Sequence, residues 1–170
     1  LGVSLQQCAD ALRSYQGIYR RHQLIGTYKG ITLIDDYAHN PAKIDASIRA
    51  CQPVAAKLVA WFQPHGYGPT RFIRHELVEE IPACLRPGDS IWMSEIYYAG
   101  GTAVKDISAA DLISDLTKKG IDAHFIADRD ELFAHLVPKL EPGTALLLMG
   151  ARDPGLEKFA EKVWDMICRT

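Results

Sequence analysis

The segment from residue 35 to residue 40 groups two carboxylates, a phenol, an imidazole and an amide: Asp35, Asp36, Tyr37, His39 and Asn40. Carboxylates in such a place suit hydroxyls, ammonium groups or a metal held through water, whereas the free N–H groups of a helix start attract anions. The same residues also have a structural explanation, with Asn40 as a helix N-cap and Asp36 as a turn residue. The segment is therefore a candidate site, and both explanations stay open on composition alone.

Three further loops carry polar side chains that could bind a ligand. His65 follows a buried stretch and precedes a glycine, which lets backbone approach a ligand, although a lone histidine is more often structural. Arg152, in the loop from residue 150 to 155, suits an anion but could equally pair with Asp153. The segment from residue 95 to 102 has paired tyrosines, which could line a pocket or pack on a helix.

The sequence lacks the common self-contained catalytic motifs. There is no G-x-x-x-x-G-K-[ST] phosphate loop and no G-x-G-x-x-G dinucleotide motif. There is also no G-x-S-x-G elbow and no H-E-x-x-H zinc motif. A nucleotide enzyme that works with this chain alone is therefore poorly supported.

Hydrophobic periodicity and turn residues predict the elements that must position these loops. Short apolar runs predict strands at 57–62, 90–96, 123–126 and 144–149, and a hairpin at 24–34 turning at Lys29-Gly30. Helices are expected at 5–15, 41–50, 70–81 (capped by Thr70 and ended or kinked by Pro82), 108–119, from 128 or 130 to 136, and 156–167. This alternation predicts an α/β fold, a Rossmann-like three-layer sandwich. Its mostly parallel sheet has about six strands and helices on both faces, and the candidate loops meet at its carboxyl edge.

Length and composition fit one ordinary globular domain spanning residues 1–170. The net charge of −2 gives no overall attraction to nucleic acid or to an anionic membrane. Four widely spaced cysteines fit neither a zinc site nor a disulfide framework, so we expect reduced thiols, no metal centre and a cytoplasmic protein. The chain opens without Met inside an amphipathic pattern, and we expect it to be part of a longer protein.

Four segments, in their order and spacing, resemble one family: Tyr19–Gly26, Asp35–Pro41, Phe62–His65 and Glu95–Gly100. Together they resemble the C-terminal domain of the Mur ligases, most of all the L-alanine-adding and murein tripeptide ligases. The resemblance implies a three-domain enzyme whose first domain holds a UDP-sugar and whose central domain carries the phosphate loop. In that family, ATP phosphorylates a substrate carboxylate to an acyl phosphate. The amine of an amino acid or peptide then displaces phosphate to form an amide.

The resemblance also implies roles for individual residues. Arg21, Asp36 and Asn40 match ATP-binding positions, and Asp36 and His39 match positions at the reacting centre. Tyr37, His39 and His65 match positions near the incoming amino acid. ATP and Mg²⁺ are expected to be held mainly by the central domain, so this chain alone is expected to be inactive.

The chain departs from the alanine-ligase pattern at several positions. Gly66 and Pro69 stand where two arginines are expected to hold the carboxylate of the amino acid, and Arg71 or Arg74, from the next helical turn, is the candidate replacement. Asn40 stands in place of a second histidine and Arg152 in place of a glycine. The alternatives are therefore a recycling ligase or a divergent ligase with another acceptor, or, in a different class, a stand-alone Rossmann-like binding module.

Overall fold

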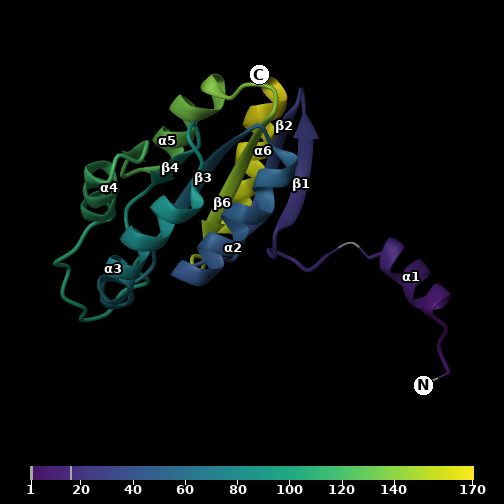
Figure 1. The fold of residues 1–170 in the computed structure, drawn as a ribbon. Coiled ribbons are helices and arrows are strands. Elements are labelled where there is room, and N and C mark those ends of the chain that lie inside the picture. The colour runs from purple at the N-terminus through teal and green to yellow at the C-terminus, as the bar shows by residue number, and fades with distance from the viewer. Residues whose placement is uncertain (1, 16) are drawn as a thin grey trace.

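The computed structural model describes residues 2–15 and 17–170, in which six strands form one sheet in the order β1-β2-β6-β3-β4-β5 (Figure 1). β1 runs antiparallel to β2, and the other neighbouring strands are parallel. The expected mostly parallel sheet is therefore confirmed. The strands are β1 (Gln23–Tyr28), β2 (Ile31–Asp36), β3 (Lys57–Gln63), β4 (Ser90–Met93), β5 (Ala123–Phe125) and β6 (Thr144–Gly150).

Helices cover both faces of the sheet, as predicted. One apolar cluster joins α2, α3 and α4 to the sheet, and a second joins α5 and α6 to its other face. The helices are α1 (Leu5–Arg13), α2 (Pro41–Cys51), α3 (Tyr67–Cys84), α4 (Ala109–Lys118), α5 (Arg129–Leu136) and α6 (Leu156–Arg169). Short 3₁₀ turns follow α2 at Gln52–Val54 and α5 at Val137–Lys139.

Burial on both faces explains why the sequences of the two central strands, β3 and β6, are continuously apolar. β6 is buried along its whole length and β3 is buried beyond its first residue. Alternate side chains point into the two clusters, so that Phe62 packs with α2 and α3 while Trp61 contacts Phe133 and Phe159 on the other face. The indole N–H of the buried Trp61 donates to Ser94 Oγ at 3.1 Å, which satisfies the one polar atom of that side chain.

Three predicted boundaries differ from the structure. α3 begins at Tyr67 rather than after a Thr70 cap, and Gly66 is its N-cap with φ of 70°. Pro69 is tolerated there because first-turn N–H groups have no partner within the helix. Pro82 does not end the helix, which continues to Cys84. The strand expected at 90–96 ends at Met93, because Glu95 turns its carboxylate to the start of α4 and accepts hydrogen bonds from Ser108 Oγ and the Ala109 N–H.

α1 lies apart from the sheet at the N-terminal end of the chain (Figure 1). It has a capping box of Ser4 and Gln7, and none of its residues is buried. Its apolar side chains Leu5 and Leu12 are 90% and 71% exposed, so α1 adds nothing to either core cluster.

The four cysteines are free thiols in the structure. Burial raises the pKa of the Cys51 and Cys84 thiols to about 12, so both stay protonated and behave as small apolar side chains. Cys8, in contrast, is exposed on α1. Among the residues that the structure describes, no helix combines the length and the apolar character needed to cross a membrane.

Candidate functional site

The carboxyl ends of three neighbouring strands bring the predicted loops together. In the register of the sheet, Met149 of β6 pairs with Asp36 of β2 on one side and with Phe62 of β3 on the other. Gly150 then pairs with Gln63. The loops that follow β2, β3 and β6 therefore leave the sheet side by side, where parallel sheets of this kind bind ligands.

A buried ion pair anchors this edge. The Arg20 Nε donates to Asp35 Oδ2 at 2.8 Å, and Arg20 Nη2 donates to the carbonyl of Gly150 at 3.0 Å. The two side chains are 8% and 5% exposed. Burial raises the pKa of the Asp35 carboxyl above its ordinary value, while the hydrogen bond and the charge of Arg20 oppose that shift. Arg20 thus ties the segment before β1 to the ends of β2 and β6, a role that the sequence analysis did not assign.

Asp36 shapes the loop after β2. One of its oxygens accepts the His22 N–H at 2.6 Å and the other accepts the Ala38 N–H at 2.7 Å. A carboxylate that accepts two backbone N–H groups fixes the turn between strand and helix. Asp36 therefore has a structural role here, and its part in ATP binding or catalysis stays a prediction.

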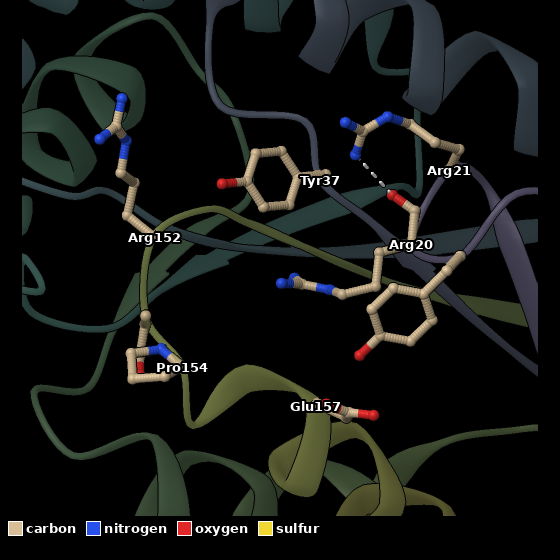
Figure 2. Close-up of a pocket in the computed structure, with 8 residues that line it drawn as sticks. Arg20, Arg21, Tyr37, Arg152, Pro154 and Glu157 are labelled. Carbon is tan, nitrogen blue, oxygen red and sulfur yellow. Dashed lines mark hydrogen bonds between the residues drawn. The ribbon is translucent and has the colours of Figure 1, made fainter.

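Tyr37 lies at this carboxyl edge of the sheet, here called the rim, between arginine side chains (Figure 2). The guanidinium carbon of Arg21 lies 4.7 Å from the centroid of the Tyr37 ring, and that of Arg20 lies 5.4 Å from it. Arg21 also donates from Nη1 to the carbonyl of Arg20 at 3.0 Å. Stacking on an aromatic ring holds a guanidinium in place while its N–H groups stay available.

The two predicted histidines meet at the same rim. The ring centroids of His39 and His65 lie 5.6 Å apart, and His39 also makes an edge contact with Tyr37 at 5.5 Å. His39 Nδ1 lies 2.8 Å from the carbonyl of Tyr37, which orients the imidazole. The predicted convergence of the loop after β2 with His65 is therefore present in the structure.

Asn40 and Arg71 are engaged by other protein groups. Asn40 caps α2 by accepting the Lys43 N–H at 3.0 Å, which is the structural explanation given above. Arg71 forms an ion pair with Asp106 and donates to the carbonyl of Val104 at 3.4 Å. Neither contact tests whether these residues bind ATP or an amino acid, and both roles stay predictions.

Two hollows open on either side of this rim. The larger, about 400 Å³, is here called the arginine hollow and is lined by Tyr19, Arg20, Arg21, Tyr37, Arg152, Asp153, Pro154 and Glu157. The smaller, about 300 Å³, lies over α2 and is lined by Arg21, His22, Asp36, Tyr37, Lys43, Ala46, Ser47 and Ala50. In the arginine hollow, Arg20 is paired with Asp35, and Asp153 is paired with Arg129. The remaining charged side chains of its lining are two cations, Arg21 and Arg152, and one anion, Glu157. An anionic group suits that balance of charge.

The arginine hollow is lined by guanidinium groups rather than by side chains that ligate a metal ion. Within residues 2–15 and 17–170, no three His, Cys, Asp or Glu side chains gather closely enough to hold a metal ion. The donor set of the arginine hollow fits phosphate or carboxylate oxygens, which guanidinium groups bind well.

His65 should titrate below an ordinary histidine. Burial lowers the pKa of His65 from its ordinary value of 6.5, and the charges of His39 and Arg152 lower the pKa further. The folded chain therefore binds this proton less readily than the unfolded chain does. Its contribution to folding stability is complete above about pH 6.5 and falls as the pH drops below that value.

An NMR titration of the His65 imidazole measures this directly. We expect a midpoint below 6.5. The midpoint should rise in Arg152→Gly and in His39→Gln, because each substitution removes a charge that opposes protonation. A midpoint at or above the ordinary value, unchanged by both substitutions, contradicts the described surroundings of His65.

Comparison with known proteins gives a consistent set of similarities. A family model described as "Mur ligase, glutamate ligase domain" matches residues 20–152. The UDP-N-acetylmuramate–L-alanine ligase of Geobacter sulfurreducens is 35% identical over 154 residues, which are 89% of this chain and 32% of that relative. The ligase of the same name from Pelotomaculum thermopropionicum is 36% identical over 155 residues, 90% of this chain and 33% of that relative.

A solved structure shares the fold. The UDP-N-acetylmuramate–alanine ligase of Thermotoga maritima superposes with a TM-score of 0.71 at 22% identity, over 96% of this chain and 33% of that chain. The present chain thus spans about a third of the length of the curated relatives it matches.

Proposed function

This chain belongs to the Mur ligase family as its glutamate ligase domain, and we propose that it closes over ATP and the incoming amino acid in a ligase that extends UDP-N-acetylmuramate. The resemblance inferred from the four motifs is thereby confirmed as membership of the family. Because the chain spans about a third of its curated relatives, the activity belongs to the longer protein in this proposal. ATP and the UDP-sugar are then held largely by the parts of the ligase outside this chain, together with Mg²⁺.

The proposed reaction forms an amide in two steps. The γ-phosphoryl group of ATP passes to a carboxylate oxygen of the muramate, which gives ADP and an acyl phosphate. The amine nitrogen of the amino acid then attacks the acyl carbon, the bond from that carbon to the phosphate oxygen breaks, and the nitrogen loses a proton. Both steps spread negative charge over phosphate oxygens, so preorganised cations and exclusion of water help them most.

The observation that carries the proposal is the convergence of His39 and His65 beside the arginine hollow, at the carboxyl edge of the sheet. In this proposal Arg21, which stacks on the Tyr37 ring, neutralises nucleotide phosphates. Asp36 fixes the loop that carries Tyr37 and His39 toward the amino acid. A cytoplasmic location, where ATP is available and thiols stay reduced, fits the four free cysteines.

Two alternatives remain distinct from this proposal. A recycling or divergent ligase would use the same rim with a peptide or another amine as acceptor, and the replacement of two expected arginines by Gly66 and Pro69 favours that possibility. A stand-alone Rossmann-like binding module would need no other domain and would consume no ATP.

The test uses the full-length protein that carries this domain. Phosphate release is measured with ATP, Mg²⁺ and UDP-N-acetylmuramate, first with L-alanine, then with each other amino acid and with the murein tripeptide. We expect release that depends on both the UDP-sugar and one acceptor, and no ATP turnover by residues 1–170 alone. ATP turnover at an enzyme-like rate by this chain alone, or no acceptor-dependent release by the full-length protein, contradicts the proposal.

A further inference from the structure

Arg152 has a backbone conformation that favours glycine. Its φ is 68°, in the left-handed region, where a β-carbon crowds the backbone. An arginine held there persists only when its surroundings fix the conformation. Strain of this kind gathers at ligand-binding positions, so the side chain needs an explanation beyond the turn itself.

The neighbours of Arg152 lock this loop. Ala151 and Asp153 on either side are buried. Asp153 accepts the Gly155 N–H at 2.7 Å through Oδ1 and forms an ion pair with Arg129 through Oδ2. Arg129 in turn donates to Gln63 Oε1 at 2.9 Å, which ties the loop to the end of β3. The loop therefore presents the Arg152 side chain from a fixed base.

The charge of Arg152 is not neutralised by any of the protein groups that the structure describes. Its guanidinium makes no hydrogen bond or ion pair with residues 2–15 or 17–170, and the residue is exposed. Arg20, which lines the same hollow, differs in this respect because it pairs with the buried Asp35. A guanidinium at the edge of a proposed active site, with its N–H groups free, is suited to an anionic ligand.

Tyr37 lies between Arg152 and Arg21. Figure 2 shows Arg21 on one side of the Tyr37 ring and Arg152 on the other, where the phenol oxygen points, with the Arg20 guanidinium below the ring. On the side of Arg152, its charge acts on His65, whose ring contacts His39. Arg152 is therefore the guanidinium of the arginine hollow whose charge reaches His65.

We propose that Arg152 binds the α-carboxylate of the incoming amino acid and so selects acceptors with a free carboxylate. This inference rests on the proposed ligase function and names the acceptor contact of the same site. A guanidinium binds a carboxylate through two parallel N–H···O bonds, which fixes the orientation of the acceptor as well as its place. The amine of the bound acceptor would then lie toward His39 and His65, where the acyl phosphate is expected.

Steady-state kinetics of the full-length ligase test this assignment, with the best acceptor from the screen above. Glycine accepts the φ of residue 152 without strain, so Arg152→Gly should fold normally. Loss of a charged hydrogen-bonded contact should raise the KM for the acceptor by about 10- to 150-fold. The kcat and the KM values for ATP and UDP-N-acetylmuramate should stay near those of the parent, because the contact is equally strong in the ground and transition states.

An acceptor without the carboxylate gives a second readout. The parent enzyme should prefer the amino acid over its α-carboxamide by about 10- to 150-fold, and Arg152→Gly should lose most of that preference. Arg152→Lys should recover part of the affinity, since it restores the charge without the planar fork. Arg169→Gln, at an exposed arginine in the last turn of α6, is the matched control and should change neither KM nor preference.

Other outcomes overturn the assignment. An unchanged KM for the acceptor in Arg152→Gly contradicts the proposed contact with the carboxylate. A raised KM for ATP in that variant indicates that Arg152 binds the nucleotide phosphates instead. If the KM for the acceptor rises in Arg71→Gln and not in Arg152→Gly, Arg71 is the residue that binds the carboxylate. If the full-length parent releases no acceptor-dependent phosphate, the ligase function fails first, and the role of Arg152 falls with it.

Discussion

Replacing Arg20 by methionine is expected to destabilise the domain by about 3–5 kcal/mol, because it leaves the Asp35 carboxylate buried without its partner. The lost contacts are the ion pair at 2.8 Å and the hydrogen bond to the carbonyl of Gly150 at 3.0 Å. Domains of this size are stable by only about 5–15 kcal/mol, so Arg20→Met should shift the urea midpoint strongly.

The loss should depend on pH in a defined direction. Burial raises the pKa of Asp35 even with Arg20 present, and removing Arg20 takes away the group that opposes that shift. Where the folded pKa lies above the unfolded value, stability is retained below the unfolded pKa and lost as the pH rises through the folded pKa. The difference between Arg20→Met and the parent should therefore be smallest in acid.

Two controls isolate the buried charge. Arg20→Met combined with Asp35→Asn should recover much of the lost stability, because the unpaired carboxylate is then absent. Arg13→Met removes an ion pair whose side chains are 73% and 54% exposed, and it should cost less than about 1 kcal/mol. A loss below about 1 kcal/mol in Arg20→Met itself would show that the pair does not anchor the edge of the sheet.

Short-range patterns predicted most of the fold. Continuous apolar runs predicted β3 and β6, and the burial of both strands explains why their sequences do not alternate. The starts predicted for α2, after the Asn40 cap, and for α4, at residue 108, agree with the structure within one residue. The start of α3 was missed because Gly66, Gly68 and Pro69 are typical of a loop, yet glycine and proline are also accepted in a first helical turn.

The candidate site was predicted where residues close in sequence form it, and missed where distant residues do. Asp36, Tyr37 and His39 lie within four positions of one another, and the order of strands brings His65 to the same edge. The role of Arg20 depends on Asp35, 15 positions on, and on Gly150, 130 positions on. An Arg-Arg pair upstream of an Asp-Asp pair was the only signal in the sequence, and it does not say which members meet.

Arg71 illustrates the same limit. Its place one turn into a helix near His65 suggested a carboxylate contact, but its guanidinium pairs with Asp106, 35 positions on. The sequence could not predict that partner, because Asp106 lies in the long loop between β4 and α4, which has no regular pattern. The position of a residue in a helix predicts the direction in which its side chain leaves the backbone, whereas the tertiary structure decides which residue it contacts.

Replacing Asp36 by alanine in the full-length ligase is expected to lower kcat/KM by about 10²-fold, because misplacing reacting groups by about 1 Å costs that much. Asp36 accepts the N–H groups of His22 and Ala38, and these two bonds place the loop that carries Tyr37 and His39. Asp36→Asn should fall between parent and alanine variant, since its single carbonyl oxygen can replace one acceptor while its amide meets the other N–H group.

Phosphate release with saturating ATP measures the loss, and circular dichroism at the assay temperature verifies that each variant is folded. The matched control is Asp45→Asn on α2, whose carboxylate pairs with Arg49 at 2.7 Å, and its kcat/KM should stay within about twofold. A folded Asp36→Ala enzyme that keeps its kcat/KM would mean that the loop after β2 does not position the reaction. The rim at the carboxyl edge would then have no part in amide formation, because His39 reaches His65 only through the turn that Asp36 holds.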